Sequence, residues 1–218
     1  MHTTGSENTA SKMPGLLLHK AMAYDLGVWI LTFGREGAMR RKILAHARLQ
    51  AGEAVLDVGC GTGSLAIEAK RQVGSAGTVC GTDGSSEMIA RAAKKARKSG
   101  FEIEYESAPA QALPFADGCF DAVLNTLMFH HLPRLSREQC AREMRRVVRP
   151  GGRVLVVDFA QSTRKEPIDF LDHLHRHGGV DPDEIVAHLE GAGLKIAESG
   201  NVGFMGLRYV LAEAPAAA

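Results

Sequence analysis

The most informative segment for chemistry is the run VLDVGCGTG at residues 55–63, in which three glycines alternate with other residues. Only glycine lets a backbone turn this tightly and leaves its main-chain atoms open to a ligand. The spacing is GxGxG rather than the GxGxxG of the dinucleotide fingerprint, and no Lys-Ser/Thr pair follows as in a P-loop. Asp57, two residues before the first glycine, suits a cationic group better than a phosphate. We therefore expect this glycine bend to bind a ligand through a positively charged part.

A second acid, Asp83, stands at the end of the next strand-like run. A carboxylate in that position can accept hydrogen bonds from both hydroxyls of a ribose. Met88, a few residues later, can pack its thioether against a flat base. Taken alone, Asp83 is equally well explained as a turn or helix-capping carboxylate. Together with the glycine bend it indicates a nucleoside site.

The elements that position these residues follow from the alternation of short apolar runs with longer helix-like stretches. Nearly consecutive apolar residues, as at 54–59, are typical of a parallel strand covered on both faces. Strands are predicted at residues 54–59, 78–83, 102–107, 120–126, 152–159, 195–202 and 207–214, and helices at residues 16–32, 35–48, 64–73, 85–99, 136–149, 166–177 and 181–192. This alternation predicts an α/β sandwich of three layers with a mostly parallel, seven-stranded sheet. The last two strands are too close for a parallel crossover, so we expect an antiparallel strand at the C-terminus.

Several helix ends are marked by capping residues. Ser85 or Ser86 can cap the helix after the second strand, and Asp181, followed by proline, can cap the last one. The helix before the fifth strand is expected to begin at Ser136 and to stop before the Pro-Gly-Gly at 150–152.

The domain organisation is expected to be simple. Residues 1–14 are polar and predict a disordered tail, and residues 15–218 predict one domain. Within it we expect an N-terminal helical cap at 15–50, a ligand-binding core at 51–160, and substrate-side helices with a hairpin at 161–218.

Composition excludes several classes of protein. The 218 residues include 26 Lys plus Arg and 25 Asp plus Glu, for a net charge of +1, which argues against a protein that binds nucleic acid by neutralising phosphates. No apolar stretch is long enough to span a membrane, and the N-terminus lacks an apolar signal core. The cysteines form no CxxC pair, which favours reduced thiols and a cytoplasmic protein. They are Cys60, Cys80, Cys119 and Cys140.

Four segments together resemble the class I S-adenosylmethionine-dependent methyltransferases, in particular the small-molecule branch with the ubiquinone/menaquinone C-methyltransferases. They are VLDVGCGTGS (55–64), GTDGSSEMI (81–89), AQALPFADGCFDAV (110–123) and MRRVVRPGGRVLVVDF (144–159). The resemblance implies a Rossmann-like fold, S-adenosylmethionine as the cofactor and methyl transfer to a small organic acceptor, for which aromatic and lipid-like molecules are the candidates. It names no oligomeric state.

The resemblance also implies a role for each matched position. Asp57 would orient the amino group of the cofactor, Asp83 would bind its ribose, and Asn125 would face the methionine carboxylate or the transfer site. The positions expected to line the methionine part are Gly59, Cys60, Gly61 and Gly63, and those expected beside the adenine are Gly84, Met88, Ala110 and Gln111. The family usually has an acid just before the Ala of the ALPF segment, but this chain has Pro109, so backbone or water must contact the adenine amino group.

Candidate groups for the acceptor side are two adjacent histidines, His130 and His131, which follow the fourth predicted strand. Histidine titrates near neutral pH, and a general base is needed if the acceptor must lose a proton early. The alternative is that one of them packs structurally and bonds to backbone. Asp158, at the end of the fifth strand, is either an acceptor contact or a turn carboxylate. Tyr24 is either a lid residue over the cofactor or a packing residue of the N-terminal helix.

Other readings of the motifs are weaker. His173 and His177 have the spacing of a helical metal pair, but no third ligand supports them, so we expect no metal. The residues Thr-Leu-Met after Asn125 differ from the Pro-Pro-aromatic signature of enzymes that methylate nucleic-acid bases, and the cysteines do not fall where arsenic methyltransferases have theirs. A protein that binds the cofactor without transferring methyl remains the alternative from another functional class.

Overall fold

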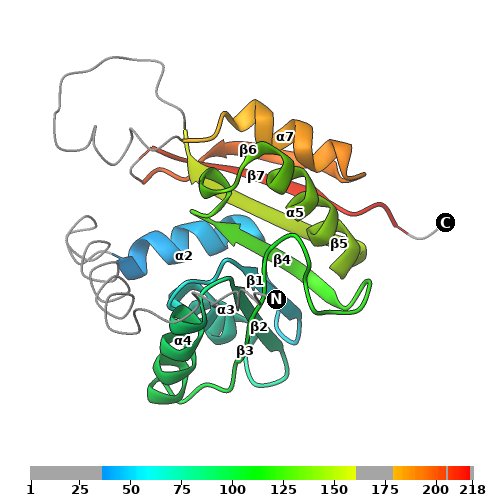
Figure 1. Ribbon diagram of the computed structural model, residues 1–218. Helices are drawn as coiled ribbons and strands as arrows, with labels where there is room; N and C mark the ends of the chain where they lie inside the picture. The colour runs from blue at the N-terminus through cyan, green and yellow to red at the C-terminus, as the bar shows by residue number, and fades with distance from the viewer. Residues whose placement is uncertain (1–35, 161–178, 205, 217–218) are drawn as a thin grey trace, which may run out of the picture.

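The computed structural model describes residues 36–160, 179–204 and 206–216, which form a sheet with helices on both faces (Figure 1). The helices are α2 (Glu36–Ala47), α3 (Ser64–Val73), α4 (Ser86–Lys98), α5 (Arg134–Val147) and α7 (Pro182–Gly191), with a 3-10 turn η1 (Phe129–His131). The strands are β1 (Ala54–Val58), β2 (Thr78–Asp83), β3 (Glu104–Ser107), β4 (Phe120–Thr126), β5 (Val148–Phe159), β6 (Lys195–Asn201) and β7 (Leu207–Glu213).

The seven strands form one sheet in the order β3-β2-β1-β4-β5-β7-β6. The strands from β3 to β5 are parallel, and β7 runs antiparallel between β5 and β6. The expected α/β class, with a mostly parallel sheet and an antiparallel C-terminal strand, is therefore confirmed. Chain order reverses between β1 and β4, and ligands of open α/β sheets bind outside the carboxyl ends of the strands at such a switch point.

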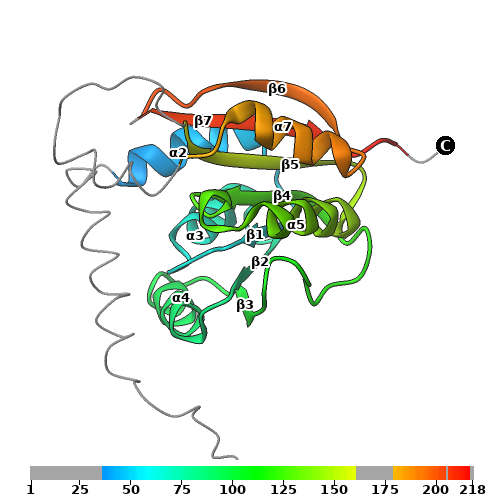
Figure 2. The same cartoon turned by 45° about the horizontal axis from the view of Figure 1, so that its top comes forward.

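The core consists of two layers, one on each side of the sheet (Figure 2). In β1, Val55 packs in the layer under α2 and α3, whereas the next residue, Leu56, packs in the layer under α5 and α7. Both are completely buried. Successive strand residues point to opposite faces, so a strand buried on both faces must be apolar at nearly every position. Asp57, on the α2 side of the same strand, is therefore a charged residue type at a position where an apolar residue is expected.

Helix ends follow their local chemistry, with one correction. Ser85 caps α4 by accepting from the Met88 amide, and Asp181 caps α7, as expected. Helix α5 begins at Arg134 rather than at Ser136, because Pro133 occupies the N-cap. It also ends at Val147, before the expected residue, and β5 begins at the next position. The residue before a proline disfavours helical dihedrals, so the chain is already extended on entering Pro150.

Several predictions fall on residues outside the described ranges. These include most of the N-terminal cap with Tyr24, the helix at 166–177, and the pair His173 and His177. The domain boundaries therefore remain predictions. None of the helices in the described ranges has both the length and the apolar character that crossing a membrane would require.

Candidate active site

The glycine bend joins β1 to α3 in a left-handed backbone conformation. Gly59, Gly61 and Gly63 have φ values of 75°, 53° and 75°. The amides of Gly59 and Cys60 both donate to the carbonyl oxygen of Thr82, each at 2.8 Å. The bend is thereby fixed to the end of β2. Residues with a Cβ rarely adopt such dihedrals, which accounts for the glycine at each position.

The three glycines nevertheless meet different surroundings. A Cβ at Gly59 would lie 2.6 Å from Cγ of Met128, and one at Gly63 would lie 2.5 Å from Oη of Tyr105. A Cβ at Gly61 would meet nothing within 4 Å. Gly63 thus permits close packing, whereas Gly61 presents its backbone to open space. Of the three, Gly61 is the one best placed to contact a ligand.

Cys60 contributes backbone rather than side chain to this bend. Its thiol is buried beside β2, where a Cβ at Gly81 would lie 3.1 Å from Sγ. Burial, with Asp57 and Asp83 nearby, raises the pKa of the thiol far above its ordinary value. It therefore stays protonated and unreactive at neutral pH.

Asp83 lies directly against the glycine bend. Its Oδ2 accepts from the Gly61 amide at 3.0 Å, and its Oδ1 accepts from the Ser85 amide at 2.9 Å. Each carboxylate oxygen has a second lone pair, so further hydrogen bonds to a ligand are possible. Gly84 is exposed, and a Cβ there would meet nothing within 4 Å. This end of β2 is accordingly both ordered by hydrogen bonds and open.

Three buried side chains near the bend, those of Asp57, Thr82 and Asn125, have polar atoms without a hydrogen-bond partner among the described residues. Asp57 is 1% exposed and neither carboxylate oxygen has a hydrogen-bond partner. Asn125 is completely buried; its Nδ2 donates to the Val58 carbonyl at 3.1 Å, but its Oδ1 has no partner. Buried polar atoms are nearly always paired in folded proteins, so these unpaired atoms are candidates for hydrogen bonds to a ligand.

The ionisation of Asp57 reflects this situation. Burial raises the pKa of its carboxyl to about 7, with Arg40 lowering it and Asp83 raising it further. Arg40 comes from α2 and lines a cavity of about 60 Å³ over the bend. A cationic group placed beside Asp57 would favour the charged carboxylate.

The cavity also contains a strained residue. Its lining comprises Met39, Arg40, Ile43, Gly59, Cys60, Gly61, Thr62, Ser64, Leu65, Thr126 and Leu127. Leu127, directly after β4, has φ of 54°, a left-handed conformation that costs energy for a residue with a side chain. Its amide donates to the Val157 carbonyl at 2.8 Å, which anchors it to β5. This turn seats the next residue, Met128, against Gly59.

The two sequence-predicted histidines lie in the 3-10 turn beyond β4, and one of them meets Asp158. Nδ1 of His130 lies 2.6 Å from Oδ1 of Asp158, and the His130 amide donates to Oδ2 at 3.0 Å. The His131 ring lies 3.9 Å from the His130 ring, centroid to centroid. Burial lowers the pKa of His131, His130 lowers it further, and Asp158 opposes both.

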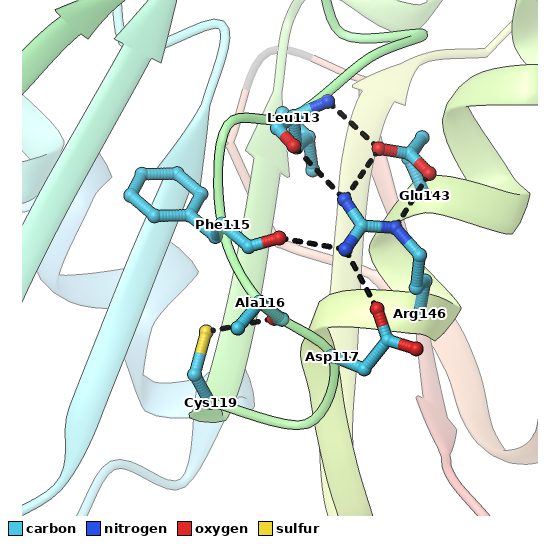
Figure 3. A network of polar contacts seen from close by, with 7 residues as sticks. All are labelled: Leu113, Phe115, Ala116, Asp117, Cys119, Glu143 and Arg146. Atoms are coloured by element: carbon cyan, nitrogen blue, oxygen red, sulfur yellow. Dashed lines mark hydrogen bonds and ion pairs between the residues drawn. The ribbon is translucent and has the colours of Figure 1, made fainter.

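A loop at residues 108–119 replaces a helix between β3 and β4 and carries Ala110 and Gln111, which are both partly buried. Arg146 of α5 holds this loop, as Figure 3 shows. Its guanidinium donates to the Leu113 carbonyl at 2.9 Å, the Phe115 carbonyl at 2.6 Å and the Asp117 carboxylate at 2.8 Å. Glu143 accepts two further bonds from Arg146 and one from the Leu113 amide.

The structure thus brings many of the predicted residues together at the carboxyl edge of the sheet. The glycine bend, Asp57, Asp83 and Asn125 surround β1 and β2, and His130 meets Asp158 between β4 and β5. Met88 lies half-buried in the first turn of α4. Sequence reasoning missed the residues that pack or hold these groups, which are Arg40, Tyr105, Met128 and Arg146. Arg40, Tyr105 and Met128 belong to none of the four segments, and Arg146 lies in one of them without a predicted role. Only their positions in space indicate what they do.

Comparisons with known proteins identify the family of this chain. A family profile for a methyltransferase domain matches residues 55–152. The ubiquinone/menaquinone biosynthesis C-methyltransferase UbiE of Bdellovibrio bacteriovorus is 38% identical over 141 residues, 65% of this chain and 59% of that protein. The UbiE of Cronobacter sakazakii is 31% identical over 199 residues, 90% of this chain and 78% of that protein. The chain therefore spans about three fifths of the length of the first of these relatives.

A solved structure has the same fold. The SAM-dependent methyltransferase from Aquifex aeolicus superposes with a TM-score of 0.73 at 24% identity, covering 90% of this chain and 97% of that one. At this level of identity the likeness concerns the fold.

Proposed function

Because this chain belongs to the class I S-adenosylmethionine-dependent methyltransferases, we propose that it transfers the methyl group of S-adenosylmethionine to a small organic acceptor. The observation that carries the proposal is the open backbone at Gly61 together with the buried acceptors of Asp57 and Asn125, which have no partner among residues 36–160, 179–204 and 206–216. A cationic amino acid moiety with a nucleoside is the kind of ligand that meets both features.

The residues present fit this cofactor. Asp57 is the counter-ion for its ammonium group, and Oδ1 of Asn125 accepts a hydrogen bond that the described residues leave unmade. Asp83 accepts hydrogen bonds from the ribose hydroxyls in addition to those from Gly61 and Ser85. The loop at 108–119 supplies backbone groups to the adenine in place of the acid that Pro109 replaces.

At the ends of β1 and β2 the protein positions the cofactor and supplies no group that makes or breaks a bond. When bound, the cofactor supplies a methyl carbon made electrophilic by its sulfonium. The glycine bend and Asp83 fix the cofactor at the ends of β1 and β2. The acceptor approaches over the ends of β4 and β5, across the switch point. Holding two reactants in line removes much of the entropic barrier to their reaction.

For the acceptor, we propose a ring carbon of a small quinone precursor. The relatives are named as C-methyltransferases of ubiquinone and menaquinone biosynthesis, and a further relative from Thermus thermophilus is named a demethylmenaquinone methyltransferase. The apolar residues Leu127, Met128 and Phe159 near the ends of β4 and β5 suit an aromatic ring.

The cofactor assignment is tested by calorimetry with S-adenosylmethionine on two matched glycine variants. Gly61 and Gly52 both have positive φ and open space around a Cβ, but Gly52 lies before β1, at the opposite edge of the sheet. Gly61→Ala should weaken binding at least tenfold, about 1.4 kcal/mol, while Gly52→Ala leaves it unchanged. Equal affinities in the two variants would place the cofactor elsewhere.

Turnover is tested with methyl-labelled cofactor and a panel of acceptors that includes short-chain demethylmenaquinol analogues. The expected product carries one labelled methyl group on a ring carbon. Tight cofactor binding with no labelled product from any acceptor would favour a protein that binds the cofactor without transferring methyl.

A further inference from the structure

The hydrogen bonds of Asp158 determine which nitrogen of the His130 ring carries a hydrogen. The Asp158 side chain is completely buried, and its oxygens accept from the amides of His130 and Phe159 as well as approaching Nδ1 of His130. An ionised carboxylate is an acceptor only, and hydrogen bonds from two amides favour the ionised form. Nδ1 of His130 must therefore carry a hydrogen, which leaves the lone pair of the neutral ring on Nε2. Among the described residues, Nε2 has no hydrogen-bond partner.

From this geometry we propose that His130 is the general base of the reaction, with Asp158 as its positioning residue. The inference rests on the proposed methyl transfer and adds to it the chemical class of the acceptor. The acceptor must be a weak acid, a phenol or an enol, whose proton has to leave before or during transfer. We choose His130 over His131 because the His130 ring has a carboxylate at its Nδ1, whereas the contact of the His131 ring with the described residues is its tilted approach to the His130 ring.

The backbone at His130 is also held in place, by an arginine of α5 and its ion-pair partner on α7. Arg137 of α5 donates from Nε to the Phe129 carbonyl at 3.0 Å, and its Nη2 lies 3.5 Å from the His130 carbonyl oxygen. Oε1 of Glu184, on α7, lies 3.0 Å from Nη1 of Arg137, and this ion pair offsets the positive charge of the arginine. The 3-10 turn is thus held to α5, and through α5 to α7.

The charged and titratable groups around the ring come from four elements. Asp158 of β5 and His131 of the 3-10 turn are its direct neighbours. Arg137 and Glu184 form the ion pair behind the turn, and His188 of α7 contacts the Phe129 ring, with centroids 6.1 Å apart. Among them the Asp158 carboxylate is closest, and it stabilises the imidazolium that forms when Nε2 accepts a proton.

The chemical step balances with these groups. The acceptor hydroxyl gives its proton to Nε2, and the electron pair that remains, delocalised onto the ring carbon, forms the bond to the methyl carbon. The carbon–sulfur bond breaks, and its electron pair stays on sulfur, which becomes neutral. The ring carbon then loses its hydrogen as a proton to water, which restores the aromatic ring, and the imidazolium returns its proton to solvent.

The tautomer is tested directly by long-range ¹⁵N–¹H spectra of the cofactor-bound protein at pH 8, assigned with His130→Gln. We expect a protonated Nδ1 and a bare Nε2 for His130. Asp158→Asn should disturb this pattern, because an amide can donate to Nδ1. A His130 ring with its hydrogen on Nε2 in the unmodified protein would overturn the proposal without bearing on cofactor binding or methyl transfer.

The role in catalysis is tested by single-turnover rates with 1,4-dihydroxynaphthalene as acceptor. His130→Gln should slow transfer by about 100-fold or more, abolish the rise of the rate with pH at its acid limb, and leave cofactor affinity unchanged. His46→Gln, a histidine in the last turn of α2 whose ring stacks on Tyr209 of β7, is the matched control and should keep both rate and pH profile.

Three results would contradict the assignment to His130. They are a His130→Gln rate within threefold of the unmodified protein, an unmodified protein without an acid limb, or a larger loss in His131→Gln. No turnover by the unmodified protein with bound cofactor would instead contradict the proposed function, and the tautomer would still be decided by the spectra.

Discussion

Two acids at the carboxyl edge of the sheet, Asp83 as the last residue of β2 and Asp158 as the residue before the last of β5, make similar backbone contacts but differ in what else they bind. Each accepts hydrogen bonds from two backbone amides, Asp83 from Gly61 and Ser85, and Asp158 from His130 and Phe159. Asp158 is completely buried and is also bound to the His130 ring, whereas Asp83 is only partly buried. Asp83 can therefore accept further hydrogen bonds from an external ligand, whereas Asp158 is occupied by the side chain of His130.

The contrast extends to the two halves of the site. On the β1–β2 side the ligand-facing groups are backbone atoms of a short glycine bend together with carboxylates. On the β4–β5 side they are side chains from separate segments, held by residues of α5 and α7. We expect substitutions in the first half to change cofactor binding and substitutions in the second half to change stability or rate.

Alanine at each of the two acids tests this contrast and should give the largest effects. Asp158→Ala leaves two amides and an imidazole without their buried acceptor, so it should lower the free energy of unfolding by about 3 kcal/mol. Asp83→Ala should instead weaken S-adenosylmethionine binding by more than tenfold, about 1.4 kcal/mol, because its ligand-facing acceptors are lost. Thermal unfolding and calorimetry on both variants give the two readouts. If the two variants lost the same property, the acids would be equivalent.

The pH dependence of cofactor binding should be the next largest effect, through Asp57. Its folded pKa of about 7 lies above the unfolded value, so the stability that it contributes to the cofactor-free protein is present in acid and is lost as pH rises through about 7. The cofactor ammonium needs the ionised form, so affinity should rise about fivefold between pH 6 and pH 7.

The control for this dependence is Asp57→Asn, which keeps the shape of the side chain and removes the charge. Its cofactor affinity and its stability should both lose the slope that Asp57 imposes between pH 6 and pH 7. Calorimetry and thermal unfolding at a series of pH values measure the two slopes. A slope that persists unchanged in the variant would assign the titration to another group.

The smallest expected effect comes from the loop between the two halves. In Arg146→Lys a single ammonium cannot bond to Leu113, Phe115 and Asp117 together, so the loop at 108–119 should loosen and cofactor affinity should fall about threefold. Arg142→Lys is the matched control, because Arg142 lies on the same helix in an exposed pair with Glu138. A loss of the same size in both variants would separate the loop from the cofactor.

Within the described residues, the helices and strands could be predicted from the sequence to within a few residues, because each carries a local signal, whereas the order of the strands in the sheet could not. Near-continuous apolar runs mark the buried parallel strands, and Ser85 and Asp181 mark helix starts. The start of α5 was predicted two residues late, because the serine at 136 was preferred to the proline that precedes the helix. Capping preferences compete over a turn, and packing decides which residue is used.

The candidate residues of the cofactor half of the site could also be predicted from the sequence, because they follow one another along the chain. A glycine bend and an acid at the next strand end are contiguous motifs, and backbone conformation depends mainly on near neighbours. The sequence could not predict that Gly63 is closely packed while Gly61 is open, since this depends on where Tyr105 and Ala92 lie in space.

By itself the sequence determined the order of strands and helices, the glycine bend and the acids beside it, because these depend on local patterns of apolar residues and on glycine dihedrals. Only the tertiary structure decided that His130 rather than His131 meets Asp158, that Arg146 holds the loop at 108–119, and that the buried Asp57 carboxylate has no hydrogen-bond partner within the described part of the chain. Such contacts join residues far apart in the chain, and their existence depends on strand register and helix packing, which no single segment encodes.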